Sequence, residues 1–87
     1  MVYVIIVYDI GVERQNTIRE FLKRFLRHVQ NSVFEGEIPE SKVFFIKKWL
    51  EARIIKEVDY VIIYVLQGSS SLEKRIELGK SKNDTLV

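Results

Sequence analysis

Apolar residues follow one another without interruption near the start of the chain, at positions 2–8, and Asp9 and Gly11 come directly afterwards. This run is rich in β-branched and aromatic residues, is too short for a helix and ends at a turn signal, so it predicts a buried strand. A second run of the same kind covers residues 60–66 and follows Asp59. Both runs are apolar on their two faces, which is typical of strands in a sheet that is covered on both sides.

Between the two runs, apolar positions recur every three or four residues, as they do on one face of a helix. The first such pattern covers residues 17–29, and its helix can begin as early as Val12. The second has a wide apolar face, covers residues 43–55 and follows Pro39, a residue suited to a helix start. Residues 28–38 mix β-forming residues with a glycine, which predicts one bent strand or two short ones.

The predicted element order is β-α-β-β-α-β, in which both helices cross over between strands. If both crossovers are right-handed, the helices lie on the same side of the sheet. This is the ferredoxin-like topology, an α+β sandwich with an antiparallel sheet and two helices on one face. The helices leave the other face, which is also apolar, without a cover. A second copy related by a two-fold axis is the simplest cover, so we predict a homodimer through that face.

Length and composition bound the remaining possibilities. The 87 residues suffice for one domain, predicted at residues 1–66, while residues 67–87 are polar and interrupted by Gly and Ser. We expect this second segment to be a C-terminal tail or an arm that pairs with the partner protomer. No apolar run approaches the roughly 20 residues of a membrane span, and there is neither a signal-peptide pattern nor a cysteine. A cytoplasmic protein without a membrane partner is therefore expected.

Asp9 is the first candidate for chemistry, because burying a carboxylate beside an apolar strand is costly unless it is paired or bound to a cation. One hypothesis is that Asp9 caps the following turn, with Gly11 supplying the bend. The other is that two Asp9 carboxylates meet across the two-fold axis and bind Mg²⁺, which usually takes one or two protein carboxylates. Such an ion would polarise a phosphodiester and lower the pKa of an attacking water. Spacing alone leaves both hypotheses open.

Basic residues mark the first predicted helix, where they can follow the phosphates of a nucleic acid or form a solvated face. The net charge of +2 does not decide between these alternatives. Two aromatic residues nearby are candidates for stacking or apolar contact with bases. The predicted nucleic-acid-binding residues are Tyr8, Arg14, Arg19, Lys23, Arg27 and Phe34. The single histidine, His28, has no Ser or Cys nucleophile pattern beside it and is predicted to be a cation at the helix end.

Four segments together resemble the CRISPR-associated protein two family, the small dimeric component of the spacer-acquisition machinery. They are VIIVYDI, ERQNTIREFLKRFL, VQNSVFEGEI and DYVIIYVL, and the resemblance covers residues 2–66. It implies a ferredoxin-like homodimer in which Asp9 is the metal-binding aspartate and Tyr8 is its neighbour. Phe34 is the aromatic residue of the strand motif, and Arg14 and Arg27 are the nearest matches to arginines that matter in the family.

The resemblance also implies an activity. Asp9 would be the catalytic and metal-binding residue of a Mg²⁺-dependent endonuclease or endoribonuclease that hydrolyses phosphodiester bonds of single-stranded RNA or double-stranded DNA. The alternative is a non-catalytic, architectural homodimer that bridges the CRISPR adaptation integrase and holds duplex DNA. A third class, a ferredoxin-like regulatory module for a small ligand, gives no reason for a basic helix beside such an aspartate.

Overall fold

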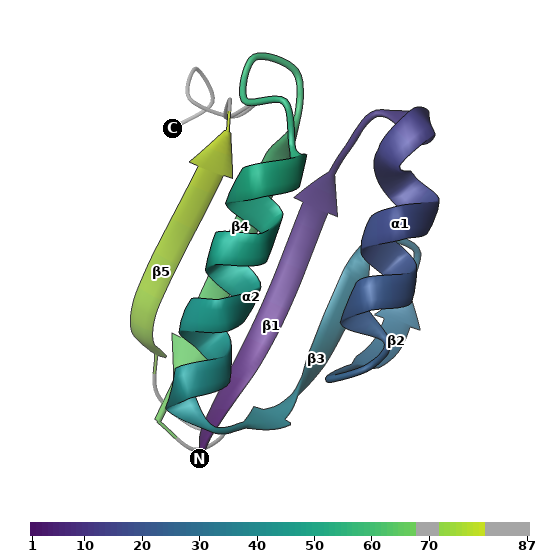
Figure 1. Cartoon of the computed structure of the whole chain (residues 1–87). Coiled ribbons are helices and arrows are strands. Elements are labelled where there is room, and N and C mark those ends of the chain that lie inside the picture. The colour runs from purple at the N-terminus through teal and green to yellow at the C-terminus, as the bar shows by residue number, and fades with distance from the viewer. Residues whose placement is uncertain (68–71, 80–87) are drawn as a thin grey trace.

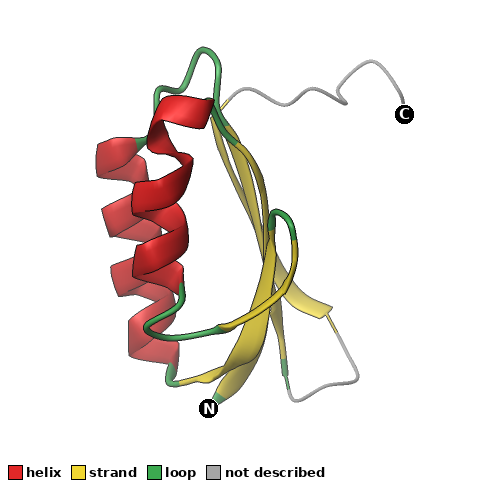
Figure 2. Ribbon diagram, turned by 90° about the vertical axis from the view of Figure 1, so that its right-hand side faces the viewer, coloured by secondary structure: helices red, strands yellow, loops and turns green. Residues whose placement is uncertain are grey.

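The structure is a computed structural model that describes residues 1–67 and 72–79. The elements in these residues are β1 (Val2–Asp9), α1 (Val12–Leu22), β2 (Arg27–Gln30), β3 (Val33–Ile38), α2 (Glu40–Arg53), β4 (Tyr60–Leu66) and β5 (Leu72–Gly79). The strands pair antiparallel in the order β2-β3-β1-β4-β5. Both helices lie on one face of the sheet and run in opposite directions (Figures 1 and 2). The predicted ferredoxin-like α+β fold is therefore confirmed.

Alternation along β1 separates the two faces of the sheet. Every second residue, from Val2 to Tyr8, is buried, whereas those between them are only half-buried. Val4 and Ile6 line the same narrow interior space as Val43 and Ile46 of α2, so the buried set points toward the helices. The hydrophobic core thus lies between the sheet and the two helices, and β1 crosses its middle.

The opposite face of the sheet carries no helix among the residues described (Figure 2). Its centre is an apolar surface contributed by the two central strands, and we call it the open sheet face. The register pairs its residues across β1 and β4 as Tyr3 with Leu66, Ile5 with Tyr64, and Val7 with Ile62. Two ion pairs on the flanking strands border it, Arg27 with Glu35 at 2.7 Å and Arg75 with Glu77 at 2.9 Å. The central strands are therefore apolar on both faces, as the sequence predicts.

The first helix differs from its prediction at its end. It begins at Val12, the earlier of the two predicted starts, and ends at Leu22, so the extension to Val29 is wrong. The chain turns after Leu22 and continues as β2, which pairs with β3, and the ring of His28 stacks on Phe34 with centroids 4.5 Å apart. His28 is therefore a strand residue and not a helix-end residue. Residues 28–38 belong to two strands joined by a tight turn.

β5 closes the other edge of the sheet. It pairs with β4 of the same chain, and Leu78 adds to the core. The strand ends at Gly79, whose φ of 87° suits glycine and where an added Cβ would collide with the backbone carbonyl of Asp59. The predicted division at residue 67, with an arm that pairs with a partner, stays a prediction, and residues 68–71 and 80–87 of that segment lie outside those described. No helix in the described chain is long and apolar enough to cross a membrane.

Candidate functional site

Asp9 is the last residue of β1 and lies opposite Tyr60 in the register with β4. Strand alternation places it on the same face as Tyr3, Ile5 and Val7, so it stands at the end of the open sheet face. The residue is exposed, and within one chain its carboxylate therefore carries no large desolvation cost. An acidic side chain at the border of an apolar face is the arrangement that the dimer hypothesis requires.

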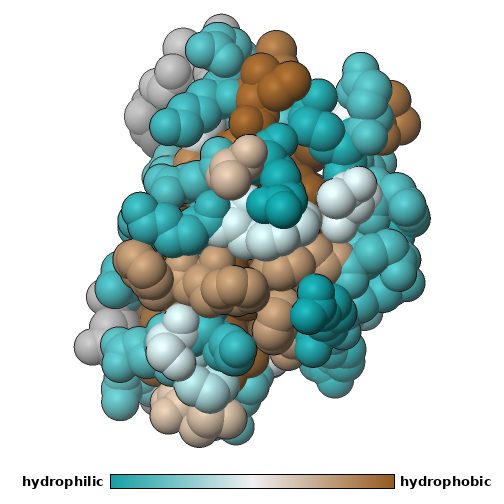
Figure 3. Space-filling view, in the orientation of Figure 1, coloured by the Kyte–Doolittle hydropathy of each residue, from teal (hydrophilic) through white to brown (hydrophobic). Residues whose placement is uncertain are grey.

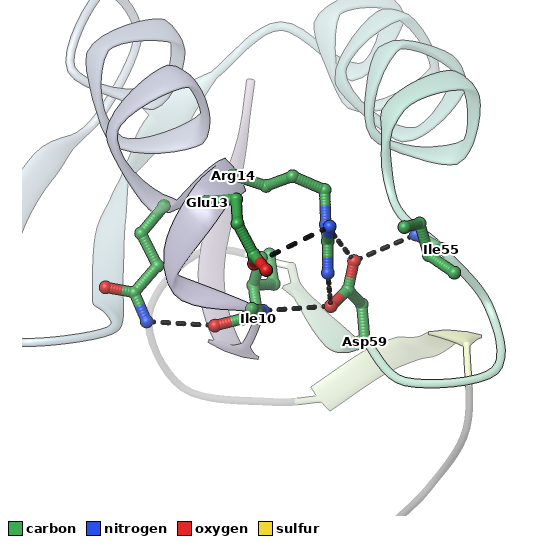
Figure 4. A network of polar contacts seen from close by, with 7 residues as sticks. Ile10, Glu13, Arg14, Ile55 and Asp59 are labelled. Carbon is green, nitrogen blue, oxygen red and sulfur yellow. Dashed lines mark hydrogen bonds and ion pairs between the residues drawn. The ribbon is translucent and has the colours of Figure 1, made fainter.

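A different carboxylate is buried at this end of the sheet. Asp59, directly before β4, has no exposed surface and holds the guanidinium of Arg14 through two hydrogen bonds (Figure 4). Nε of Arg14 donates to Oδ2 at 2.6 Å and Nη2 donates to Oδ1 at 2.8 Å. The backbone N–H groups of Gly11 and Ile55 also donate to this carboxylate, at 2.9 and 2.8 Å. The buried charge is thus fully compensated.

These contacts stabilise the ionised form of Asp59. The hydrogen bonds from Arg14 lower the pKa of its carboxyl to about 2, with further help from the N–H groups of Ile55 and Gly11, although burial acts in the opposite direction. The same contact raises the pKa of Arg14. The network ties the turn after β1 to the start of α1 and to the loop between α2 and β4. It therefore fixes the backbone immediately after Asp9.

One of the two hypotheses for Asp9 is that it caps the following turn, but the carboxylate that accepts the N–H of Gly11 belongs to Asp59. The sequence does contain a signal for the structural role of Asp59, because this residue also stands directly beside a continuous apolar strand. Burying the carboxylate of Asp59 is as costly as burying that of Asp9 unless the charge is compensated. What the sequence does not give is the pairing with Arg14, which is 45 residues away along the chain.

The predicted basic residues do not share one surface element. Arg14 is turned toward Asp59 and is only 21% exposed, while Arg19 donates to Oδ1 of Asn16 at 2.6 Å. Lys23 follows the last residue of α1, and Arg27 lies on β2 rather than on the first helix, contrary to the prediction. Lys23 and Arg27 are exposed. A nucleic-acid contact by any of these side chains stays a prediction.

The two predicted base-stacking residues are both buried. Phe34 has no exposed surface, and its ring lies between those of His28 and Tyr8, with the Tyr8 centroid 6.2 Å away. Tyr8 is on the helix-facing side of β1, and burial raises the pKa of its hydroxyl, partly offset by the nearby charge of Arg19. In this structure Tyr8 and Phe34 are core residues, and their contact with bases stays a prediction.

The candidate ligands for a divalent metal ion are few. The described part of the chain contains no group of three or more His, Cys, Asp and Glu side chains that could hold one. Mg²⁺, however, keeps several waters and needs only one or two protein carboxylates. A single chain offers one exposed carboxylate, that of Asp9, and two copies related by a two-fold axis offer two. The donor type therefore fits Mg²⁺, and the number of donors depends on a second protomer.

The chain forms a small antiparallel sheet with two helices on one face and an apolar surface on the other. An aspartate ends the central strand. These features define a class of compact ferredoxin-like proteins. The chain belongs to the CRISPR associated protein Cas2 family, whose model matches residues 1–74. The match agrees with the resemblance noted in the sequence and extends it beyond β4.

Known proteins support this assignment over almost the whole chain. The CRISPR-associated endoribonuclease Cas2 of Nanoarchaeum equitans is 53% identical over 81 residues, which are 93% of this chain and 88% of that protein. The protein of the same name from Methanothermobacter thermautotrophicus is 45% identical over 87 residues, covering 99% and 96% of the two chains. A solved crystal structure of cas2 is 38% identical, has a TM-score of 0.73 and covers 99% of this chain and 95% of its own.

Proposed function

We propose that this chain is a CRISPR spacer-acquisition protein that acts as a metal-dependent endoribonuclease or endonuclease in a homodimer. The observation that carries the proposal is the position of Asp9, exposed at the end of the central strand and on the border of the open sheet face. Relatives that are 53% and 45% identical carry the name endoribonuclease. Single-stranded RNA and duplex DNA are the two candidate substrates.

The homodimer in this proposal forms through the open sheet face. Its central strands present apolar side chains such as Ile5, Val7 and Tyr64, which are only half-buried in the single chain. Removing that apolar area from water favours a second copy, and a two-fold axis makes the surface complementary to itself. In such a dimer the Asp9 residues of the two protomers border the same interface. The dimer therefore supplies the second carboxylate that one chain lacks.

The two Asp9 carboxylates are the residues that would hold Mg²⁺. When bound, the ion supplies polarisation of the phosphodiester and a more acidic water. The chain's own contribution is to fix the position of Asp9. β1 holds it between β3 and β4, and Asp59 fixes the following turn through Gly11 and Arg14. Arg14 is in this view a positioning residue, while the exposed cations of Lys23 and Arg27 are suited to phosphates.

The test is the substitution Asp9→Asn, which keeps the size of the side chain but removes the charge that a divalent ion needs. We expect Mg²⁺-dependent cleavage of single-stranded RNA or duplex DNA to disappear while the dimer and nucleic-acid binding persist. Glu57→Gln, an exposed acid in the loop after α2, is the matched control and should cleave like the unsubstituted protein. Full cleavage by purified Asp9→Asn, after a contaminating nuclease has been excluded, would refute the catalytic role.

A second candidate function is an architectural dimer that bridges the CRISPR adaptation integrase and holds duplex DNA without cutting it. The observation favouring it is the sparse set of candidate ligands, since no described group of three or more potential metal ligands accompanies Asp9. We would conclude that this function applies if neither the unsubstituted protein nor Asp9→Asn cleaves nucleic acid while both still dimerise and bind duplex DNA.

A further inference from the structure

An aromatic patch lies on the outer surface of the two helices, on the side away from the open sheet face. It consists of Phe25 in the turn after α1 and of Phe44, Phe45 and Trp49 from α2. The rings of Phe25, Phe45 and Trp49 pack on Phe21, which is itself buried. In Figure 3 an apolar band crosses the middle of this surface between hydrophilic regions. Phe44 is 60% exposed and Phe45 is 47% exposed, although neither side chain is needed to fill the core. Exposed aromatic groups of this size indicate a surface that meets a partner.

Among the described residues, four cations stand over the rings of this patch. Lys42 lies 5.3 Å from the centroid of Phe45, Lys48 lies 5.4 Å from that of Phe44, and the guanidinium of Arg53 lies 4.0 Å from the Trp49 ring. Arg24 is the fourth, 5.5 Å from the Phe25 centroid. The patch therefore combines apolar rings with a rim of positive charge.

Most of this rim lacks acidic partners among the side chains that the structure describes, those of residues 1–67 and 74–79. Lys48 has Glu51 at 3.9 Å, but no carboxylate of these residues lies within ion-pair distance of Arg24, Lys42 or Arg53. The complementary partner is one that brings carboxylates to the rim and apolar side chains to the rings.

A nucleic acid suits the patch less well, because base stacking needs a free ring face. The Trp49 ring lies parallel to that of Phe21, with an interplanar angle of 1° and centroids 3.7 Å apart. Arg53 covers its other face at 4.0 Å. The largest ring of the patch is thus enclosed on both faces, and Phe44 and Phe45 each have a lysine over one face. The ring surface of Phe44 and Phe45 that stays exposed and the cations around it are suited to apolar and acidic side chains of a protein.

A hollow of about 340 Å³ extends the patch on the side of β5. Phe44 forms part of its wall, its base is apolar, and the charged residues that line it are Glu40, Lys47 and Lys74. It offers space for one apolar side chain of a partner next to two lysines, which outnumber the single carboxylate. We propose that the aromatic patch and this hollow bind an acidic amphipathic segment of a partner protein, which lies along α1 and α2 in the manner of a helix in a groove.

The test begins with random peptides of helical length displayed on phage and selected on the unsubstituted protein. Trp49, the only tryptophan of the chain, then reports binding of a synthetic consensus peptide that itself lacks tryptophan. We expect the selected peptides to combine Asp or Glu with apolar residues at helical spacing and to change Trp49 fluorescence. Phe45→Ser and Lys42→Glu should each weaken binding about tenfold or more.

Matched controls separate this surface from general effects of charge and hydrophobicity. Val58→Ser and Lys56→Glu change an exposed apolar residue and an exposed cation in the loop between α2 and β4, and both should bind the peptide normally. Circular dichroism establishes that each variant folds, and Lys42→Glu alters only an exposed side chain.

Selected peptides without acidic residues, or with equal affinity for Lys42→Glu and Lys56→Glu, would overturn the proposal. A Trp49 change with oligouridine that the same two variants abolish, and none with the peptide, would assign the patch to single-stranded nucleic acid. Because Asp9 is not involved, cleavage by the variants is a separate readout.

Discussion

Removal of the charge on Asp59 is expected to destabilise the fold by an amount that depends on pH. Asp59→Asn keeps the shape of the side chain but replaces a carboxylate that has no exposed surface and accepts from Arg14, Gly11 and Ile55. The amide has only one acceptor oxygen and turns an NH₂ group toward donors. Leaving the Arg14 guanidinium without its buried partner places the expected loss at about 3–5 kcal/mol at neutral pH.

The pKa of Asp59 gives a separate measure of the same network. Its value of about 2, against an ordinary 3.8, corresponds to about 2–3 kcal/mol of stability when the group is ionised in both states. Above the ordinary value this stabilisation is fully present. As the pH falls from about 4 toward 2, the unfolded chain takes up the proton first, so stability is lost in that window. The Asp59→Asn variant has no carboxyl group at this position, so it should not lose this part of its stability as the pH falls.

The assay is urea unfolding followed by circular dichroism between neutral pH and pH 2, at one fixed protomer concentration because dimerisation would shift the apparent stability. We expect the gap between the unsubstituted protein and Asp59→Asn to be largest at neutral pH and to narrow below pH 4. Glu57→Gln, an exposed acid two residues away, should leave the free energy of unfolding nearly unchanged. A loss below about 1 kcal/mol at neutral pH, or a gap that does not change with pH, would refute the reasoning.

Three further predictions concern the sheet. Gly79→Ala should cost about 1–3 kcal/mol in urea unfolding, because φ is 87° and the new Cβ meets the carbonyl of Asp59; an unchanged midpoint would contradict this. Phe34→Ala should cost about 3–5 kcal/mol, because the ring is fully buried, and a loss below about 1 kcal/mol would show that the site collapses without penalty. Ile5→Glu should shift sedimentation equilibrium toward the monomer, because it places a charge within the open sheet face; an unaltered dimer would move the interface elsewhere.

The period of the apolar residues is sufficient to predict the layers of this fold. Alternation in β1 and β4 gives two strands that are apolar on both faces, and the structure places one face against the helices and leaves the other open. Helical spacing before β2 and after Pro39 predicts that α1 and α2 exist, although α1 ends at Leu22 and not at Val29. These features follow from the period of apolar residues within each segment, which the sequence shows directly.

The errors occur where contacts between distant residues override the local pattern. Leu26 and Val29 continue the helical spacing, but the pairing of β2 with β3 and the stack of His28 on Phe34 place Val29 in a strand, and Leu26 lies in the bend before that strand. The spacing of apolar residues within one segment does not reveal this strand, because a sheet forms between several segments. The same limit hides the bond between Arg14 and Asp59, and it is why Arg14 is predicted as a phosphate contact.

The two aspartates at this end of the sheet separate structural from chemical roles. Asp59 stands just before Tyr60, the residue opposite Asp9, so the two acids occupy the same region of the molecule. Asp59 is buried and stabilises the turn, whereas Asp9 is exposed on the other side of that turn. Asp59→Asn should therefore lower the free energy of unfolding, and Asp9→Asn should remove cleavage with a stability change of about 0.5 kcal/mol or less. If Asp9→Asn instead destabilises the protein as strongly as Asp59→Asn, loss of cleavage no longer identifies Asp9 as the residue that holds the metal ion.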